Sequence, residues 1–457
     1  MLDREYLEKC FRKAARKKTK RSDVRKVLEN LDENVNFLLG ILEREEFVPA
    51  YHEPKIIHES AARKERRIVK PNYKYEQVVH HAAIGQFSSI VQHGLYEHVC
   101  GSIPGRGTHS GSETVEKWIR EYNGKKFYVL KTDIRHYYDS VDRGILKEKL
   151  KKVIRDKRFL RLMYILIEYD RIPEVIHFMT KAGRKPSLQD QKDLSTAIAY
   201  GRSGEAMEIV DRYDPDPALR EKIEKIITEY RKGIPLGYLT SQWNGNFVLK
   251  DLDQYIIQVL RPDRYIRYAD DMVFFSTNKR KLRKIREEVD RYMKEELKIE
   301  MKKNWQIFRF EYTGRDKEKV RGRMIDFLGF QFHTDRKTLR KSTLKRIRRK
   351  ALKIGKKDRV TWYDASQMLS YMGSIKHADV YNYYEKYIKE NISVKKLKKI
   401  VSNHARKEKK QNESKLQKVG KYDRTGSSGS GVESVDGICP EECPEIQERG
   451  RPDGLPV

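Results

Sequence analysis

Two adjacent acids, Asp270 and Asp271, stand inside RYIRYADDMVFFST (264–277), a run that is otherwise mostly aromatic and aliphatic. Burying an isolated carboxylate costs several kcal/mol unless a positive group meets it. A bound metal ion would supply that charge. Alternatively, the pair forms the turn of a hairpin between the strand patterns YIRYA and MVFFS. The two explanations are compatible, because a hairpin tip can carry acids to a site shared with another strand.

A third acid ends a second strand pattern. In KKFYVLKTDIRHYYDSVD (125–142), the apolar run FYVLKTDI has the character of a buried strand and reaches Asp133 near its end. Three such carboxylates, brought together, would suit divalent cations. Asp139 and Asp142 precede the helical pattern RGILKEKLKKVI, and we expect both to be helix caps.

The charge balance points to a polyanionic partner. The chain has 457 residues, 38% of them hydrophobic, and its formal net charge is +31. This length allows two or three domains, and the charge predicts binding that weakens steeply with salt. Nucleic acid is the leading candidate and a membrane surface is the competitor. Because no apolar run of about 18 residues and no secretory segment is present, we expect a cytoplasmic protein without a membrane partner.

The four cysteines are too scattered for a disulfide framework. Cys439 and Cys443, in CPEEC, form a weak candidate for a metal or redox pair, since no second pair lies nearby.

The remaining patterns predict a mixed α+β fold. The first 26 residues carry 11 Lys or Arg against 4 acids, with leucines and a phenylalanine at helical spacing, which predicts a basic amphipathic helix. A second helix follows, and then ARKERRIVKP is expected to form a hairpin that presents Arg66 and Arg67. Residues 144–232 have helical character, and GIPLGYLTSQ (233–242) forms a loop that leads into a helix. After the acidic pair come an amphipathic helix (279–299), a strand MIDFLGFQFH (324–333) and basic helices.

In this order the motifs resemble the palm of a template-directed polymerase, and more narrowly a bacterial reverse transcriptase. KTDIRHYYDSVD resembles the first acidic motif, YADD the metal-binding hairpin, GIPLGYLTSQ the loop against the base pair, and FLGF the strand that leads to the thumb. The resemblance implies a right-hand polymerase with fingers, an antiparallel palm sheet and a helical thumb. It implies these boundaries: a basic N-terminal helical extension at 1–62, fingers and palm at 63–335 with a helical insertion at about 171–230, a thumb at 336–402, and a basic segment with a disordered acidic tail at 403–457.

The resemblance also implies a catalytic metal site. Asp133 and Asp270 would bridge two Mg²⁺ ions, with Mn²⁺ as a substitute, Asp271 would complete the site and the Ile134 carbonyl would add an oxygen ligand. Two such ions about 4 Å apart activate a 3′ hydroxyl and neutralise the departing pyrophosphate. The implied partners are template RNA, the RNA/DNA hybrid and dNTPs.

Further residues would bind the nucleotide by resemblance. Tyr138 occupies the position of an aromatic ring that rejects a 2′ hydroxyl; the alternative is a core tyrosine, the role we expect of Tyr137. Arg66 and Arg67 fall where the fingers hold the triphosphate. Lys303, or its neighbour Lys302, is the candidate acid for pyrophosphate, and a solvated surface lysine is the alternative for each.

The loop before the second helix departs from the commoner pattern. Group II intron and retron enzymes usually have Gln-Gly, three residues and Ser-Pro, whereas this chain has Leu236, Gly237, three residues, Ser241 and Gln242. That variant resembles the reverse transcriptases of diversity-generating retroelements, which implies low fidelity and a small accessory protein as a candidate partner. Leu236 removes an amide that could hydrogen-bond the nucleotide, so selection should loosen.

Two rival functions remain open. One is another polymerase of the same architecture: a defence-associated or group II intron-like reverse transcriptase, or an RNA-dependent RNA polymerase, against which Tyr138 argues. The other is a non-catalytic RNA-binding scaffold, with which three retained acids fit poorly. Residues 395–424 carry 12 Lys or Arg against 3 acids, and they would contact template RNA or an acidic partner, or else form a solvated helix.

Overall fold

The fold is taken from a computed structural model, which describes residues 3–53, 55–59, 64–122, 124–313 and 320–407. The described residues divide into two compact units, one formed by residues up to 346 together with 373–384, and the other by 347–372 and 385–407. Cys439, Cys443 and the predicted tail from residue 408 onward lie outside the described residues.

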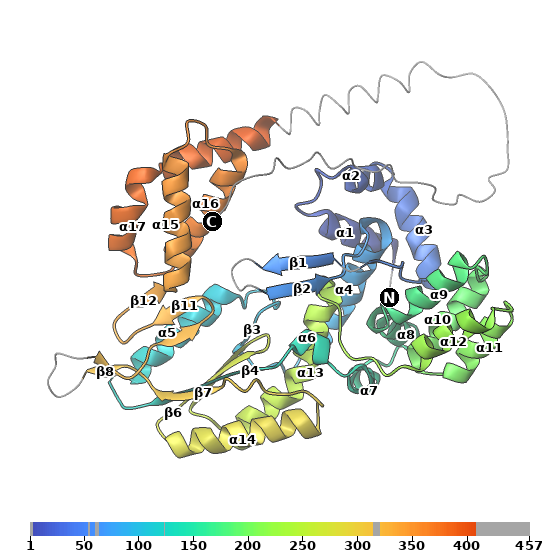
Figure 1. Cartoon of the computed structure of the whole chain (residues 1–457), viewed down its shortest axis with the longest axis horizontal. Helices are drawn as coiled ribbons and strands as arrows, with labels where there is room; N and C mark the ends of the chain where they lie inside the picture. Colours follow the sequence, from blue (N-terminus) through green and yellow to red (C-terminus); the bar gives the residue numbers. More distant parts are fainter. Residues whose placement is uncertain (1–2, 54, 60–63, 123, 314–319, 408–457) are drawn as a thin grey trace. The chain divides into compact units, whose positions relative to one another are not determined.

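A five-stranded sheet forms the centre of the first unit (Figure 1). Its strands, in spatial order, are β3 (Val99–Cys100), β5 (Arg264–Tyr268), β6 (Asp271–Ser276), β4 (Tyr128–Asp133) and β7 (Gln306–Arg309). All neighbours are antiparallel except β3 and β5. The central strands carry the apolar runs recognised in the sequence, and side chains such as Val129, Leu130, Phe274 and Phe275 are fully buried.

Helices pack on this sheet through apolar stripes. The helix α14 (Lys279–Glu295) contacts β4, β6 and β7, and it buries Leu282, Ile285, Val289 and Met293 at helical spacing. The helix α5 (Thr108–Tyr122) contacts β3 and β5. The predicted helix after the glycine loop is α13 (Leu239–Tyr255), which continues into η2 (Ile256–Leu260) and packs against α4 (Val78–Gln92).

The N-terminal segment is a small helical layer against α4. It consists of α1 (Arg4–Ala15), α2 (Ser22–Glu29) and α3 (Leu31–Glu43), followed by the hairpin of β1 (Lys55–Glu59) and β2 (Lys64–Ile68) and the π-helix η1 (Tyr73–Gln77). The prediction of one continuous helix over the first 26 residues is wrong. The helix ends at Ala15, with Arg16 as its C-cap, and Lys17 adopts a left-handed φ of 65°. The run of like charges from Arg16 to Arg21 disfavours continuation of the helix.

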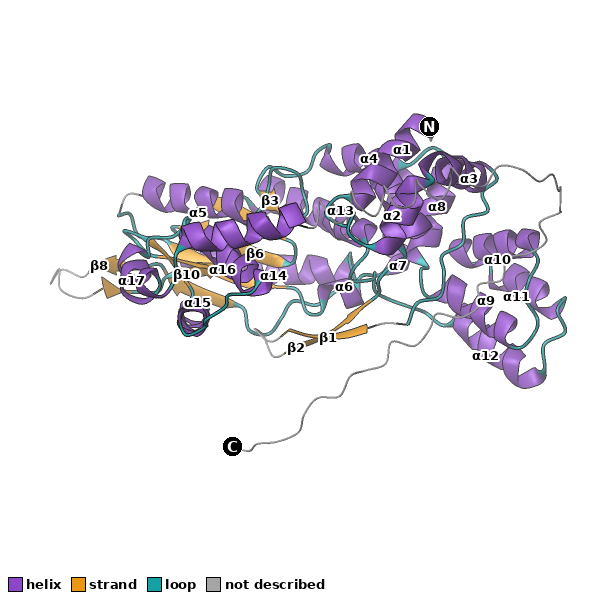
Figure 2. Cartoon of the chain, turned by 90° about the horizontal axis from the view of Figure 1, so that it is seen from above, coloured by secondary structure: helices purple, strands orange, loops and turns teal. Residues whose placement is uncertain are grey.

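A helical module follows the short helix α6 (Tyr137–Ser140). Its members are α7 (Arg143–Val153), α8 (Lys157–Ile167), α9 (Arg171–Lys181), α10 (Leu188–Tyr200), α11 (Ser203–Asp211) and α12 (Pro217–Thr228). Figure 2 shows α9 to α12 gathered side by side, away from the sheet. Residues 171–230, predicted as a helical insertion, are thus mainly helical, and α9 to α12 pack on one another.

The stretch MIDFLGFQFH, predicted as one strand, forms two. β10 (Ile325–Phe327) and β11 (Phe330–Phe332) make a tight hairpin, and β12 (Lys337–Leu339) adds a third strand. The turn residues Leu328 and Gly329 have φ of 56° and 88°, the left-handed pair that a two-residue hairpin turn requires. The glycine in FLGF was the signal of this turn. A separate pair, β8 (Tyr312–Thr313) and β9 (Val320–Arg321), lies nearby in sequence.

The C-terminal part is helical. It contains α15 (Lys341–Gly355), α16 (Trp362–Ile375), α17 (Tyr381–Tyr387), the 3-10 turn η3 (Lys389–Asn391) and helical residues 394–407. Within the second unit, the buried Asp364 accepts from Lys350 and Lys357, which holds the start of α16 against α15. No helix in the described ranges combines the length and apolar character needed to cross a membrane.

Candidate active site

The sheet register brings the three predicted acids together. Asp133, the last residue of β4, is the direct cross-strand partner of Asp271, the first residue of β6. Asp270 lies in the two-residue turn between β5 and β6, and its carboxyl group interacts with that of Asp133. The hairpin explanation of the acidic pair is therefore confirmed: the acids form a hairpin tip, and the tip meets the end of another strand. The bound metal ion stays a prediction.

A buried ion pair supports the hairpin turn. The Arg267 guanidinium donates from Nε to Asp253 Oδ1 over 2.8 Å, and both side chains are completely buried. The same guanidinium donates from Nη1 to the Ala269 carbonyl over 2.8 Å. Ala269 has a left-handed φ of 53°, a conformation that costs an L-residue energy. Arg267 thus fixes a strained turn directly before Asp270, and its partner on α13 was not found from the sequence.

The acids are short of compensating positive charge. Burial, with a further contribution from Asp133, raises the pKa of Asp270 to about 7. Burial also raises the pKa of Asp271 to about 6, although Lys131 opposes the shift. Asp133 Oδ1 and Asp271 Oδ1 are buried and have no hydrogen-bond partner among the described residues. Two such carboxylate oxygens on facing residues leave unused hydrogen-bond acceptors at this end of the sheet.

Two lysines meet these acids. Lys302 donates to Asp133 Oδ2, and its backbone N–H also donates to the Asp133 carbonyl over 2.8 Å. Lys131 Nζ lies 3.6 Å from Asp271 Oδ2 and donates to the carbonyl of Asp326. Lys303, the residue predicted for pyrophosphate, is exposed, and its alternative Lys302 is the one that reaches the acids. Lys131 was missed, although its position two residues before Asp133 places both side chains on one face of β4.

The donor set fits hard divalent cations by type. Within the described ranges, no group of three or more His, Cys, Asp or Glu side chains is arranged to hold a metal ion, and Lys302 and Lys131 pair with Asp133 and Asp271. The orphaned oxygens of Asp133 and Asp271 nevertheless provide ligands of the kind that Mg²⁺ takes. The Ile134 carbonyl was predicted to be a further metal ligand. The backbone N–H of Lys302 donates to the Asp133 carbonyl and that of Arg135 donates to the Glu300 carbonyl, so neither hydrogen bond uses the Ile134 carbonyl.

A cavity of about 430 Å³ opens beside the acids. Its lining includes Asp133 and Asp271 together with the cationic side chains of Lys131, Arg323 and Arg340. The Arg340 guanidinium donates from Nε to Asp326 over 2.7 Å. An anionic group in this cavity would meet positive charge next to the carboxylates.

Tyr138 lies beside the predicted nucleotide loop. The backbone N–H of Ile234 donates to the Tyr138 carbonyl over 2.8 Å, so the loop follows the segment that carries this ring. Tyr138 is half-buried against Tyr137, with ring centroids 5.4 Å apart. Tyr137 itself is buried and donates its hydroxyl to the Gly245 carbonyl, as expected of a core residue.

The other face of the loop meets the N-terminal hairpin. The Val69 N–H donates to the Leu236 carbonyl over 3.1 Å. Gly237 has a φ of 113°, and a Cβ there would lie 2.3 Å from the Val69 oxygen, so only glycine fits this approach. Leu236 is half-buried, and Gln242 is exposed on α13.

Arg66 and Arg67 lie in β2, two or three residues before Val69, opposite Ile57 and Ile56. Their side chains lie outside the part of the chain that the structure describes, so their predicted nucleotide contacts stay a prediction.

The two capping predictions have different outcomes. Asp142 caps α7 by accepting from the Ile145 N–H over 3.1 Å, as predicted. The prediction for Asp139 is wrong: this exposed residue lies inside α6. Three residues, 140–142, separate Asp139 from the first residue of α7, the helix it was expected to cap.

The sheet and its acids define a class of fold. An antiparallel sheet whose neighbouring central strands carry facing aspartates, with a third acid in the hairpin turn, is the palm arrangement of right-hand polymerases. The predicted α+β polymerase fold is thereby confirmed.

The comparisons with known proteins give little beyond this geometry. No family model and no curated protein matches the chain. Matching solved structures include apo telomerase from Candida tropicalis, 10% identical over 71% of this chain and 53% of that one, with a TM-score of 0.38. Telomerase from Candida albicans in complex with a TWJ fragment of telomeric RNA is 12% identical over 80% and 59%, with a TM-score of 0.35. The chain spans a little over half of each of these telomerase chains, and likeness at this level carries no argument.

Proposed function

We propose that this chain is an RNA-directed DNA polymerase that makes cDNA by nucleotidyl transfer. The observation that carries the proposal is the convergence of Asp133, Asp270 and Asp271 at one end of the sheet, with an orphaned oxygen on each of the two facing acids. A non-catalytic scaffold has no need of three neighbouring carboxylates that Lys131 and Lys302 compensate only in part, because such burial destabilises the fold.

The three aspartates would hold two Mg²⁺ ions, and Mn²⁺ would substitute. Bound metal would lower the pKa of a primer 3′ hydroxyl and neutralise charge on the leaving pyrophosphate. The chain's own part is to position these acids: the β4–β6 register aligns Asp133 with Asp271, and Arg267 holds the turn that carries Asp270.

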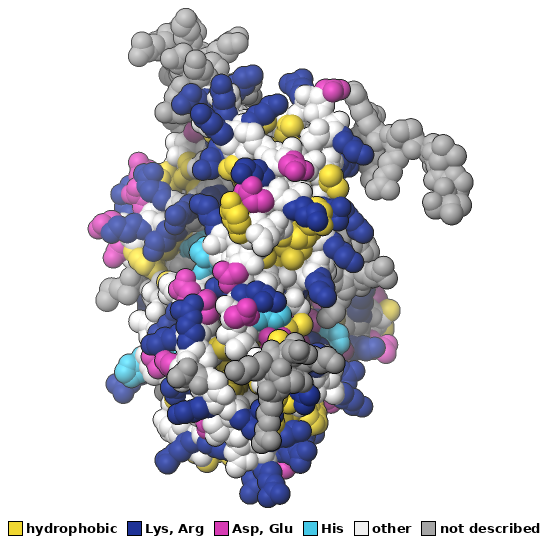
Figure 3. Space-filling model, turned by 90° about the vertical axis from the view of Figure 1, so that its left-hand side faces the viewer, with side chains coloured by type: hydrophobic (Ala, Val, Ile, Leu, Met, Phe, Trp, Pro, Cys, Tyr) yellow, Lys and Arg dark blue, Asp and Glu magenta, His cyan; other side chains and the backbone are white. Residues whose placement is uncertain are grey.

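RNA as template and dNTPs as substrates are the proposed specificity. The net charge of +31 supports a polyanionic partner, and Figure 3 shows Lys and Arg side chains spread over much of one face. The half-buried Tyr138, next to the loop of Leu236 and Gly237, would meet the sugar of the incoming nucleotide and exclude a 2′ hydroxyl. The Leu236 to Gln242 pattern favours a diversity-generating retroelement, low fidelity and a small accessory partner.

The direct test is primer extension on an RNA template with Mg²⁺, comparing dNTPs with NTPs. Wild-type protein is expected to extend with dNTPs, whereas Asp271→Ala is expected to abolish extension and leave RNA binding intact. The matched control is Asp335→Ala, at an exposed aspartate that pairs with its neighbour Arg336. Full activity of Asp271→Ala, or RNA binding by the wild type without extension under any condition, would refute the proposal.

A further inference from the structure

A buried arginine, Arg143, joins three segments that surround the proposed nucleotide site. It is the first residue of α7 and only 3% exposed, and two residues separate this helix from α6, which carries Tyr138. Its Nε donates to the Gly233 carbonyl over 2.8 Å, directly before the loop of Leu236 and Gly237. Its Nη1 and Nη2 donate to the two carboxylate oxygens of Asp170 over 2.7 and 3.0 Å.

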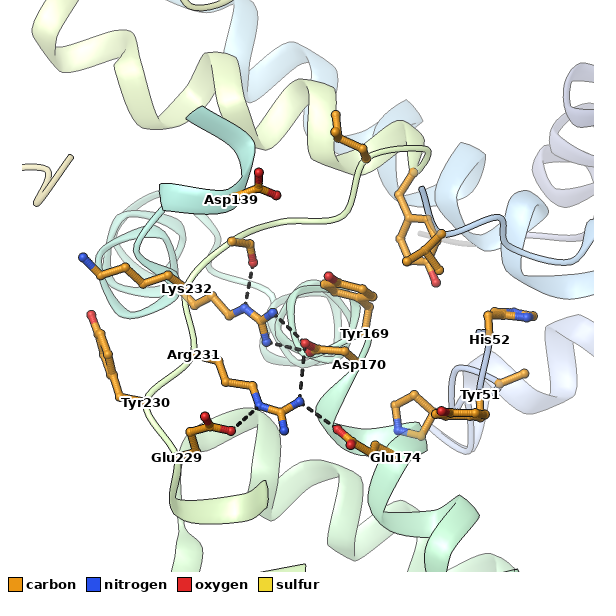
Figure 4. Close-up of a pocket in the computed structure, with 17 residues that line it drawn as sticks. Tyr51, His52, Asp139, Tyr169, Asp170, Glu174, Glu229, Tyr230, Arg231 and Lys232 are labelled. Atoms are coloured by element: carbon orange, nitrogen blue, oxygen red, sulfur yellow. Dashed lines mark hydrogen bonds and ion pairs between the residues drawn. The ribbon is translucent and has the colours of Figure 1, made fainter. Parts of the chain in front are cut away.

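The loop is also tied to the helical module by a second arginine. Arg231 Nη1 donates to Glu174 over 2.8 Å, and its Nε donates to Glu229 over 3.1 Å, as Figure 4 shows. Arg171 Nη2 donates to the Glu229 carbonyl. The segment 229–233 is therefore fastened to α9, the helix after α8, through Arg171 and Glu174, and at Gly233 it is fastened to Arg143 of α7.

Close backbone packing connects this network to the nucleotide site. The Gly233 N–H donates to the Val141 carbonyl over 2.7 Å, next to the bond between Ile234 and Tyr138. A Cβ on Gly233 would lie 3.1 Å from the Asp139 carbonyl oxygen, so the two strands of backbone are in contact. A movement of 229–233 would consequently shift Tyr138 and Leu236 relative to each other.

We propose that Arg143 is a positioning residue for nucleotide selection, and that the helical insertion acts through the Arg143–Asp170 pair as a brace for the loop 233–237. This inference rests on the proposed function. A planar guanidinium is needed because it bonds a carbonyl and a carboxylate pair at once, which an ammonium group cannot reproduce. Glu168 also accepts from Arg143 Nη1 over 3.0 Å, which keeps the buried cation compensated on its remaining side.

The test compares Arg143→Lys and Asp170→Asn with Arg161→Lys. Arg161 is a matched control because it is also a buried arginine of the module, 7% exposed, but it bonds Thr196 and the Lys192 carbonyl instead of the loop. Hydrogen exchange of the peptide 229–238, in full-length protein, reports positioning without requiring activity. Steady-state extension then gives KM and kcat for dNTPs, and NTPs measure sugar discrimination.

Arg143→Lys and Asp170→Asn are both expected to speed hydrogen exchange in the peptide 229–238. Both should also raise the KM for dNTPs about tenfold, change kcat less, and discriminate less between dNTPs and NTPs. The control should match wild type in all of these. Unchanged exchange, or equal KM shifts in Arg161→Lys, would overturn the inference. If wild type fails to extend, the proposed function falls, while unchanged exchange in an active enzyme defeats the brace alone.

Discussion

Arg267 and Asp253 form an ion pair with neither side chain exposed to solvent. The pair links β5 to α13, and the remaining nitrogen of the guanidinium supports the Ala269 carbonyl in the acidic hairpin. The free energy of desolvating both charges is offset by several hydrogen bonds, among them one from Arg267 to Asn246 over 3.1 Å.

Removing one member of this pair should destabilise the protein strongly. Asp253→Asn is expected to lower the free energy of unfolding by about 3–5 kcal/mol, because it leaves a buried guanidinium uncompensated. Denaturant titration monitored by circular dichroism measures this change. Arg264→Met provides the comparison, since its pair with Glu121 is largely exposed and should contribute less than about 1 kcal/mol. Equal losses in both variants would show that the buried pair has no special role.

Lys302 and Lys303 should differ in their effect on turnover. Lys302 donates to Asp133, whereas Lys303 is exposed, so we expect Lys302→Ala to lower the single-turnover extension rate about 10²-fold and Lys303→Ala to change it less than about twofold. Rapid-quench measurement at saturating dNTP distinguishes a slower chemical step from weaker dNTP binding. A larger loss in Lys303→Ala would restore the assignment of that residue to pyrophosphate.

The metal-free protein should lose stability as the pH rises. The pKa values of Asp270, about 7, and Asp271, about 6, lie above the ordinary value near 3.9, so the folded state holds these protons more tightly than the unfolded state. The resulting stabilisation is complete below about pH 4 and is lost as the pH rises through 6 to 7. The Tm of wild type minus that of Asp270→Asn should therefore fall between pH 5 and 8 in EDTA.

Mg²⁺ should reverse that trend, because it binds the deprotonated carboxylates. Added Mg²⁺ is expected to raise the Tm at pH 8 more than at pH 5.5, and the effect should be small in Asp270→Asn. A Tm that Mg²⁺ leaves unchanged at both pH values would count against a metal site at these acids.

Replacing Leu236 should change fidelity without loss of the loop. Leu236→Gln adds an amide at a half-buried position whose backbone carbonyl is already fixed by Val69, so we expect fewer misincorporations at similar stability. Sequencing of cDNA made from a defined RNA measures the error rate. Gly237→Ala is the contrasting variant, because its Cβ would collide with the Val69 oxygen and should abolish extension. Unchanged error rates in Leu236→Gln would remove the argument for loose selection.

The sequence revealed the acids because each stands where an apolar strand pattern ends. Asp133, Asp270 and Asp271 could be assigned to one site from those patterns and their order. Contacts that depend on the exact register or on distant helices gave no such signal: Lys131 against Asp271 requires the pairing of β4 with β6, and Arg267 with Asp253 requires the packing of α13.

Local backbone geometry explains the other differences. The hairpin at Leu328 and Gly329 and the helix break at Lys17 depend on single residues with a left-handed φ, which strand and helix periodicity does not report. Likewise, Arg143 resembled any other charged residue at the start of a helix until its bond to Gly233 placed it between the loop and the insertion.

Asp133 and Asp271 are direct cross-strand partners, and their alignment depends on the number of residues in the β5–β6 hairpin. The length of this hairpin is therefore more strictly constrained than the identity of its apolar residues. One residue added between Tyr268 and Met272 that shifts the register would turn every side chain of the shifted strand to the opposite face of the sheet and carry one acid away from the others. Swaps among apolar residues at the flanks would leave that alignment in place. Substitutions of apolar residues in this segment should therefore be tolerated, whereas insertions and deletions should not.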